Sequence, residues 1–180
     1  LLNCAFLAIL RSYQVCLAAG LEQFCRELLL LFGLVSIGWA AVFILGQSDY
    51  KRMLAYSSVE HMGILAIGIG IGAGATYGSM LHAVNHSLTK AMLFMAAGNI
   101  LTVYKTKTTK DVSGALSIMP ITGILWIGGF LAITGMPPFG IFLSEFTIIK
   151  SMIEQGKIAI AIAFLIVLSL VFIGMAIAFL

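Results

Sequence analysis

The stretch LHAVNHSLTKAMLFMAAGNI, residues 81–100, decides the class of this protein. It is long enough for a membrane-spanning helix and consists mostly of Ala, Leu, Met and Phe, yet it carries His82, His86 and Lys90 at intervals of four residues. This spacing places the three side chains along one face of a helix, each displaced by about 6 Å along the axis from the last. The stretch therefore predicts an apolar helix with one polar face.

The composition of the whole chain indicates a membrane protein. Of 180 residues, 61% are hydrophobic and 9% are charged, and the mean hydropathy is +1.11. A soluble domain is about half apolar and about a quarter charged, so this chain has too few charges to solvate a globular surface. The net charge of +3 and the lack of a basic run exclude nucleic-acid binding as the expected function.

Apolar segments of about 20 residues predict an all-α polytopic membrane protein with about six transmembrane helices in one domain. The expected spans are 1–19, 28–46, 50–71, 77–103, 114–153 and 157–180. The chain begins at Leu1 without Met and stops at Leu180 inside an apolar run, so we interpret it as a fragment of a longer subunit.

The fifth span is too long for one straight crossing, and the sequence ITGMPPFG, residues 133–140, interrupts it. Two successive prolines remove a backbone donor and disfavour the helical conformation, which predicts a discontinuous helix broken near 135–138. Free backbone groups at membrane depth must be satisfied by protein or water, so we expect the break to lie inside the protein. The alternative is a helix that simply ends at a Pro-Pro loop.

Loop charges predict an orientation. One set of loops carries Lys51, Arg52, Lys105, Lys107 and Lys110. The other set carries Arg26, Lys150, Lys157 and, by its place near a span end, Arg11. By the positive-inside rule the first set is cytoplasmic.

Further ionisable residues are predicted at membrane depth, where a charge costs about 2.5–3.5 kcal/mol on the mildest scale. Glu60 and His61 lie near the middle of the third span, and Glu145 follows the break in the fifth. Histidine titrates near neutral pH, and burial brings lysine and glutamate towards the same range. Together with the polar face of residues 82–90, this set predicts a proton relay.

Other functions of these residues are weighed against the relay. His82 and His86 have the spacing of a zinc-binding pair, but Ala83 replaces the glutamate of an HExxH motif. His61 and a histidine of the fourth span suit haem ligation between neighbouring helices. Each group could also serve only as a hydrogen-bonding partner for a neighbouring helix. The three cysteines form no CxxC pair, which argues against an iron–sulfur or zinc site.

Three motifs carry a family resemblance: SDYKRMLAYSSVEHMG (48–63), LHAVNHSLTKAMLFMAAGNI (81–100) and ITGMPPFGIFLSEF (133–146). They resemble the antiporter-like proton-translocating subunits of complex I (NADH–quinone oxidoreductase), Mrp-type Na⁺/H⁺ antiporters and membrane-bound hydrogenases. The SSVEHMG and GMPPFGIFLSEF forms are most similar to component F of hydrogenase-4, from formate hydrogenlyase-type complexes.

The resemblance implies a fourteen-helix subunit of two inverted five-helix repeats, each with a broken helix. This chain would then be helix eight through helix thirteen, mostly the second repeat. In the family the polar axis runs through the positions of His82, His86 and Lys90, and Glu145 stands where members carry Lys or Glu at the exit half-channel. Lys51 and Arg52 match the cytoplasmic turn that precedes a helix in the family.

The chain departs from the family at two positions. Asn3, in LLNCAFLAILR, stands where many members have a central lysine, and an amide cannot exchange a proton. Glu60 stands where complex I members usually have Ser, and it could supply the titratable group that Asn3 lacks.

From the resemblance we expect a proton-translocating subunit of a redox-driven respiratory or hydrogenase complex. The alternatives are an Mrp-type Na⁺/H⁺ antiporter subunit and a haem-binding or structural anchor. No cofactor is expected in this chain, with metal and iron–sulfur centres in partner subunits. The expected partners are the lipid bilayer, other membrane and peripheral subunits, and protons or Na⁺, in a bacterial or archaeal inner membrane.

Overall fold

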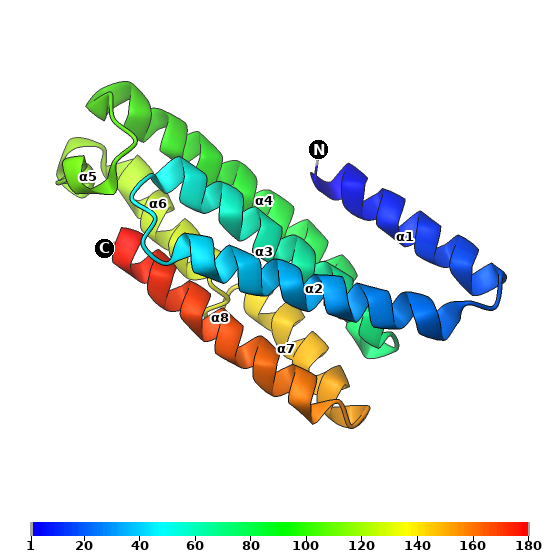
Figure 1. Ribbon diagram of the computed structural model, residues 1–180. Helices are drawn as coiled ribbons and strands as arrows, with labels where there is room; N and C mark the ends of the chain where they lie inside the picture. The colour runs from blue at the N-terminus through cyan, green and yellow to red at the C-terminus, as the bar shows by residue number, and fades with distance from the viewer. Residues whose placement is uncertain (1, 180) are drawn as a thin grey trace.

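The computed structural model describes residues 2–179, and this part of the chain is almost wholly helical (Figure 1). The elements are α1 (Leu2–Ala18), α2 (Glu22–Ile44), α3 (Tyr50–Ile71), α4 (Gly74–Tyr104), the 3-10 turn η1 (Thr109–Asp111), α5 (Ala115–Ile118), α6 (Pro120–Ile133), α7 (Gly140–Glu154) and α8 (Ile158–Phe179). Leu1 and Leu180, the outer ends of the predicted first and last spans, lie outside the described residues.

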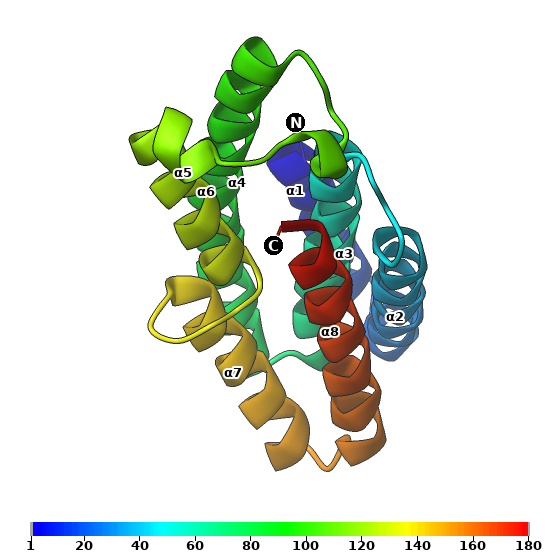
Figure 2. The same cartoon turned by 90° about the vertical axis from the view of Figure 1, so that its left-hand side faces the viewer.

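Helix length and hydropathy confirm a helical membrane protein. Of the described helices, α2, α3 and α8 are long and apolar enough to cross a membrane. The helices α1 and α6 are apolar but have only 17 and 14 residues. The 31-residue α4 carries the polar face predicted from the sequence. The short helices α6 and α7 follow each other end to end across the bundle (Figure 2).

The helix α3 forms the centre of the bundle. In the apolar 18-residue stretch of α3, 72% is buried, compared with 33% in that of α2 and 28% in that of α8. It packs between α2 and α4, as both views show (Figures 1 and 2). A Cβ on Gly33 of α2 would lie 2.9 Å from the carbonyl oxygen of Gly63 of α3, so these two backbones touch directly. Small residues that allow such close approach are typical of packed membrane helices.

Two basic segments, the start of α3 and the loop after α4, meet at one end of the bundle. Asp49 caps α3 by accepting hydrogen bonds from the backbone N–H groups of Lys51 and Arg52, at 2.8 and 3.0 Å. The backbones of Asp49 and Thr108 form an isolated antiparallel β-bridge. The Tyr50 hydroxyl donates to the carbonyl of Thr106 at 3.0 Å. Lys51 and Arg52, which the structure places in the first turn of α3 rather than in a loop, therefore lie at the same end of the bundle as the segment after α4 that carries Lys105, Lys107 and Lys110.

The discontinuous helix is interrupted between Ile133, where α6 ends, and Gly140, where α7 begins. Gly135 has a φ of +68°, and the peptide bond between Pro137 and Pro138 is cis. The carbonyl of Phe130, at the end of α6, accepts hydrogen bonds from both the backbone N–H of Thr134 at 3.1 Å and the Thr134 hydroxyl at 2.8 Å. The break extends slightly beyond the predicted 135–138.

The largest differences from the predicted boundaries lie in two places. The helix α2 begins at Glu22 rather than at 28, and its first turns contain Glu22 and Arg26, which form a 2.6 Å ion pair; hydropathy leaves such charged residues out of a predicted span although they can continue the helix. The segment expected as one interrupted span from 114 contains a separate four-residue helix, α5. Pro120 causes this division, because it cannot continue a preceding helix but is well suited to begin one.

Candidate functional site

The ionisable residues predicted at membrane depth are all enclosed in the bundle. Each of the following side chains is at most 6% exposed: Glu60, His61, His82, His86, Lys90 and Glu145. They come from three helices, α3, α4 and α7, which pack together around the break. Buried ionisable groups are costly without polar partners, so their mutual positions determine what the site can do.

The three histidines form one cluster. Nδ1 of His61 and Nε2 of His82 are 2.9 Å apart, within hydrogen-bonding distance. The ring centroid of His61 lies 5.0 Å from that of His82 and 4.7 Å from that of His86. The rings of His82 and His86 are farther apart, at 6.3 Å. The sequence predicted that His82 and His86 share one face of a helix; the structure adds His61 of α3, which lies closer to each of them than they lie to each other.

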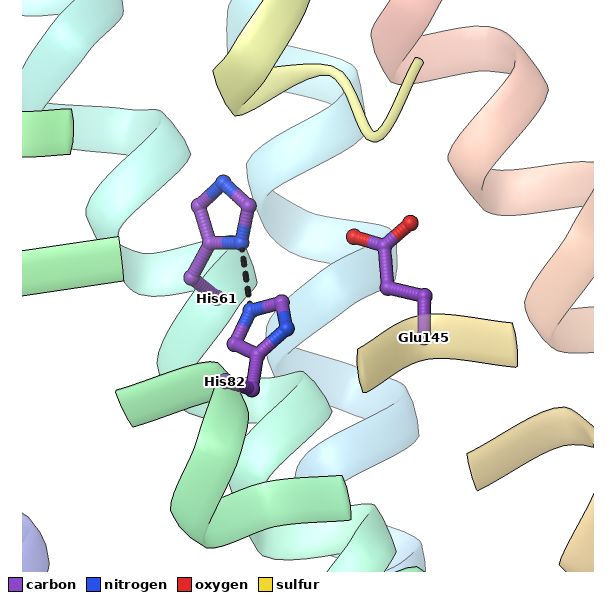
Figure 3. A group of neighbouring side chains, drawn as sticks. All are labelled: His61, His82 and Glu145. Atoms are coloured by element: carbon purple, nitrogen blue, oxygen red, sulfur yellow. Dashed lines mark hydrogen bonds between the residues drawn. The ribbon is translucent and has the colours of Figure 1, made fainter. Parts of the chain in front are cut away.

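The broken helix contributes two adjacent side chains to this cluster. Ser144 Oγ lies 2.9 Å from Nδ1 of His82 and itself donates to the carbonyl of Ile141 at 2.7 Å. The Glu145 carboxyl is turned towards His61 and His82 (Figure 3). It also packs against Gly135 in the break, where a Cβ would lie 3.1 Å from the carboxyl carbon. The first turns of α7 thus reach both the break and the histidines.

Lys90 is held by α3. Its ammonium group donates to the carbonyl of Leu54 at 2.6 Å and to the hydroxyl of Ser57. It also interacts electrostatically with Glu60 and with His86. Lys90 therefore connects the polar face of α4 to the central helix, rather than only continuing a line along α4.

Both ends of the break meet polar side chains, whereas Met136, Pro137 and Pro138 in its middle are exposed in the described chain, which differs from the expectation of an enclosed break. The carbonyl of Ile133, at the end of α6, faces His61. The side chain of Asn85 packs on Gly140 at the start of α7, where a Cβ would lie 2.8 Å from its amide atoms. The negative end of the α6 dipole is thereby directed towards the histidine cluster.

Several buried nitrogen atoms make no hydrogen bond to any residue of the described chain. They are Nε2 of His61, Nδ2 of Asn85 and both ring nitrogens of His86. Nε2 of His61 lies 4.0 Å from a Glu60 carboxylate oxygen, about 1 Å longer than a hydrogen bond. Buried polar atoms of this kind are usually satisfied by ordered water. The cluster is therefore suited to hold water between its side chains.

Asn3 lies apart from the buried cluster. It is exposed on α1, and its side-chain amide donates to Ser87 Oγ on α4 at 2.6 Å. Ser87 in turn donates to the carbonyl of Ala83. In the described chain Asn3 fastens α1 to α4, and the structure does not bring it into contact with the histidines.

Some polar partners were not singled out from the sequence. Ser57 and Ser144 bind Lys90 and His82, and the carbonyls of Leu54 and Ile133 face Lys90 and His61. Both serines were visible in the motifs, three residues before Glu60 and one before Glu145. The carbonyls carry no sequence signal, because every residue has one.

The haem alternative does not fit this geometry. Haem ligation by His61 and a histidine of α4 requires a porphyrin between the two imidazoles. The rings of His61 and His82 are instead in direct hydrogen-bonding contact, and His61 packs on His86 as well. The pair weighed as an alternative zinc site, His82 and His86, is also not the group with the closest ligand atoms. That group is His61, His82 and Glu145, whose ligand atoms lie within 4.8 Å of one another.

A family described as NADH:quinone oxidoreductase/Mrp antiporter, transmembrane, matches residues 1–171. The chain belongs to this family. Among the relatives of this transmembrane family, a hydrogenase-4 component F homolog from Methylacidiphilum infernorum is 40% identical over 163 residues, which are 89% of this chain and 34% of that protein. The resemblance read from the three motifs is confirmed at the level of the family, and hydrogenase-4 component F is among the relatives.

Solved structures agree with this membership. A chain of the membrane-bound sulfane sulfur reductase, an archaeal respiratory membrane complex, matches 84% of this chain with a TM-score of 0.78 and 26% identity. A chain of the Mrp complex from Dietzia sp. matches 95% with a TM-score of 0.82 and 19% identity, which shows a shared fold. The chain spans about a third of the length of these proteins. It is a membrane-embedded fragment of an antiporter-like subunit.

Proposed function

We propose that this chain moves protons as part of an antiporter-like subunit of a redox-driven complex, of respiratory or hydrogenase type, in a bacterial or archaeal inner membrane. One observation carries the proposal. A continuous set of buried titratable side chains crosses from the broken helix to the central helix, with neighbours in contact or electrostatically coupled. Ionisable residues in such positions mark proton pathways in membrane proteins.

The order of the proposed relay follows the contacts. Glu145 on α7 lies beside His61 and His82, which share a hydrogen bond. His61 packs on His86, whose ring nitrogens are free for water, and His86 interacts with Lys90. A histidine can accept a proton on one nitrogen and release one from the other, so this sequence of groups supports stepwise transfer.

Glu60 gives the relay a charge partner on α3. It interacts with Lys90 and with Glu145, and it lies 4.0 Å from His61. Its carboxyl group is therefore placed to respond to protonation at both ends of the set. This position supports a role in the relay for Glu60, where complex I members usually have Ser. The position of Asn3 in the described chain supports no such role.

The electrostatic energies are sufficient for such a pump. Moving one proton against about 200 mV requires about 4.6 kcal/mol. A unit charge about 6 Å away contributes about 2.8 kcal/mol at an effective dielectric constant near 20. Two changes of this size in the same direction exceed the requirement. Protonation of Glu60 removes an attraction for the Lys90 charge and protonation of His86 adds a repulsion, so both changes favour loss of the Lys90 proton. Protons that reach Glu60 and His86 can therefore drive proton release from Lys90.

The test uses the complete complex in proteoliposomes, with protons pumped per electron as the measured quantity. Lys90→Ala and Glu145→Gln are expected to abolish pumping while leaving much of the electron transfer. Lys90→Arg keeps a permanent charge and hydrogen-bond donors but cannot lose its proton, so it is also expected to abolish pumping. That variant separates proton exchange from a merely structural role of the ammonium group.

A matched control is available on the same broken helix. Glu154 is exposed and pairs with Lys150 at 3.7 Å, so Glu154→Gln is expected to keep the stoichiometry of the unmodified complex. An unchanged proton-to-electron ratio in both Lys90→Ala and Glu145→Gln would disprove the relay.

A second candidate function is Na⁺/H⁺ exchange in an Mrp-type assembly, because the matched family includes the Mrp antiporters. Carboxylates are the ligands that suit Na⁺, and the cluster has two, Glu60 and Glu145. Vesicles that contain the complete assembly decide between the two functions. Sodium-dependent pH exchange without electron transfer supports the antiporter, and its absence supports the redox-driven pump.

The proposed partners are the bilayer and further membrane and peripheral subunits. The metal and iron–sulfur centres needed for electron transfer are proposed to reside in those subunits, because the motifs of this chain provide no cysteine cluster for them.

A further inference from the structure

The cluster of His61, His82 and Glu145 combines the donors of a transition-metal site. One ligand atom of each residue lies within 4.8 Å of the others, and all three side chains are buried. They come from three different helices, α3, α4 and α7, and converge on one point (Figure 3). Two histidines and one glutamate are the protein ligands of a well-known class of zinc sites.

We propose that His61, His82 and Glu145 form an inhibitory binding site for a transition-metal dication, with Zn²⁺ as the preferred ion. Imidazole nitrogens favour Zn²⁺ and its neighbours in the first transition row, whereas Ca²⁺ and Mg²⁺ favour oxygen ligands. The ion is a reversible inhibitor in this proposal and not a resident cofactor. It binds Nδ1 of His61 and Nε2 of His82, the two nitrogen atoms that face each other.

The outer contacts of the histidines orient them for metal binding. A histidine that binds a metal usually donates its other N–H to a carboxylate, a carbonyl or a similar acceptor. For His82 that acceptor is Ser144 Oγ, 2.9 Å from Nδ1. Nε2 of His61 makes no hydrogen bond in the described chain, but the ring faces the carbonyl of Ile133 and a Glu60 oxygen lies 4.0 Å from Nε2, so acceptors for its N–H are at hand. These contacts leave Nδ1 of His61 and Nε2 of His82 as the metal-binding nitrogens.

The metal–ligand distances of zinc are reached by small movements. With bonds of about 2.0–2.1 Å, tetrahedral ligands lie about 3.3 Å apart. Nδ1 of His61 and Nε2 of His82 are 2.9 Å apart and need to separate by a few tenths of an ångström. The Glu145 oxygen approaches the pair from within 4.8 Å. Glu145 lies in the second turn of a helix that begins at a break, and it lines a cavity beside that break.

Charge and access also favour a dication. Glu145 binds it directly and contributes one opposing negative charge, and Glu60 lies beside His61. The nearby ammonium of Lys90 is compensated by its interactions with Glu60 and with the carbonyl of Leu54. Glu145 also lines a cavity of about 590 Å³ between the break, α7 and α8. Its carboxyl is therefore reachable from the cavity on one side and from the histidines on the other.

Binding is tested on the complete complex, stripped of metal with a chelator and titrated with Zn²⁺ in equilibrium dialysis. We expect His61→Gln, His82→Gln and Glu145→Gln each to weaken Zn²⁺ binding by about tenfold or more. His86→Gln is the matched control, because His86 is a buried histidine of the same cluster that lies outside the trio, and it is expected to keep the affinity. Unchanged affinity in both His61→Gln and His82→Gln overturns the site.

A measurement on the unmodified complex guards against variants that fail to fold. X-ray absorption of the Zn²⁺-loaded complex is expected to show two imidazole ligands with Zn–N distances of about 2.0–2.1 Å. A coordination shell made only of oxygen atoms overturns the proposal. Ser144→Ala leaves all three ligands in place and removes the contact to His82, so it is expected to lower the affinity by about 10–100-fold.

The inhibitory effect rests on the proposed function, whereas the binding measurement does not. We expect proton pumping to fall in step with Zn²⁺ occupancy and to recover when a chelator is added. Full occupancy without loss of pumping overturns the inhibitory role and leaves the binding site in place. Loss of pumping in Lys90→Ala supports the proton relay, and intact Zn²⁺ binding in the same variant supports the metal site independently.

Discussion

At the scale of single residues, His61 is the residue whose contacts differ most from what the sequence indicates. In the sequence it is a histidine next to Glu60, on a separate span from His82 and His86. In the structure it contacts both histidines of α4, at 2.9 Å to His82 and with ring centroids 4.7 Å apart from His86. Its position depends on the close packing of α3 against α4, which no local pattern specifies.

The glycine in the break offers a residue-scale prediction. Gly135 has a φ of +68°, and a Cβ there would press on the Glu145 carboxyl. Gly135→Ala is therefore expected to lower the free energy of unfolding by about 1–3 kcal/mol and to reduce proton pumping by displacing Glu145. Thermal unfolding and pumping of the purified complex measure the two effects.

Gly20 is the control for Gly135. It has a φ of +76°, but nothing lies within 4 Å of its Cβ position. Gly20→Ala is expected to cost only the backbone strain and to leave pumping unchanged. Equal pumping in the two variants would show that Gly135 does not position Glu145.

At the scale of helices, the broken helix and the α2–α3 pair determine the site. The break directs the carbonyl of Ile133 towards His61 and places Gly140 against Asn85. The direct contact between Gly33 and Gly63 holds α3 in the centre, where Ser57 and Leu54 can bind Lys90. The sequence predicted the break from its two prolines, but it did not predict which helices would meet its ends.

The glycine contact between α2 and α3 gives the helix-scale prediction. A Cβ on Gly33 would lie 2.9 Å from the Gly63 carbonyl oxygen, and backbone cannot yield as a side chain does. Gly33→Ala is therefore expected to destabilise the protein by about 1–3 kcal/mol. Gly38, on the same helix, has nothing within 4 Å of its Cβ position, so Gly38→Ala is expected to stabilise it by up to about 1 kcal/mol.

Thermal unfolding of the two alanine variants in the same detergent provides the comparison. Because both glycines lie within α2, helix propensity changes in the same direction in each variant. A Gly33→Ala variant as stable as Gly38→Ala would contradict the proposed tight contact.

At the scale of the whole molecule, the ends of the bundle differ in their loops. The Asp49–Thr108 bridge joins the start of α3 to the loop after α4, and the predicted cytoplasmic charges lie in the first turn of α3 and in that loop. The turn between α7 and α8, with Lys157, lies at the opposite end (Figure 2). The structure fixes which loops lie together, and the positive-inside rule predicts which end faces the cytoplasm.

Labelling of introduced cysteines tests the orientation in intact cells. Arg52→Cys and Lys107→Cys are expected to react with a membrane-impermeant thiol reagent only from the cytoplasmic side, and Lys157→Cys only from the other side. The native cysteines Cys4, Cys16 and Cys25 are replaced by serine to remove the background. Labelling of Arg52→Cys and Lys107→Cys from opposite sides would contradict the shared end.

The sequence by itself determined the properties that depend on neighbours along the chain. Hydropathy predicted an all-helical membrane protein, the spacing of His82, His86 and Lys90 predicted a shared face, and Pro137 with Pro138 predicted the break. Only the tertiary structure decided which groups meet. It brought His61 to His82, Lys90 to Leu54 and Glu145 to the histidines, and it left Asn3 outside. The physical reason is that helix formation depends on local hydrogen bonds and burial, whereas contacts between helices depend on how side chains distant in sequence pack together.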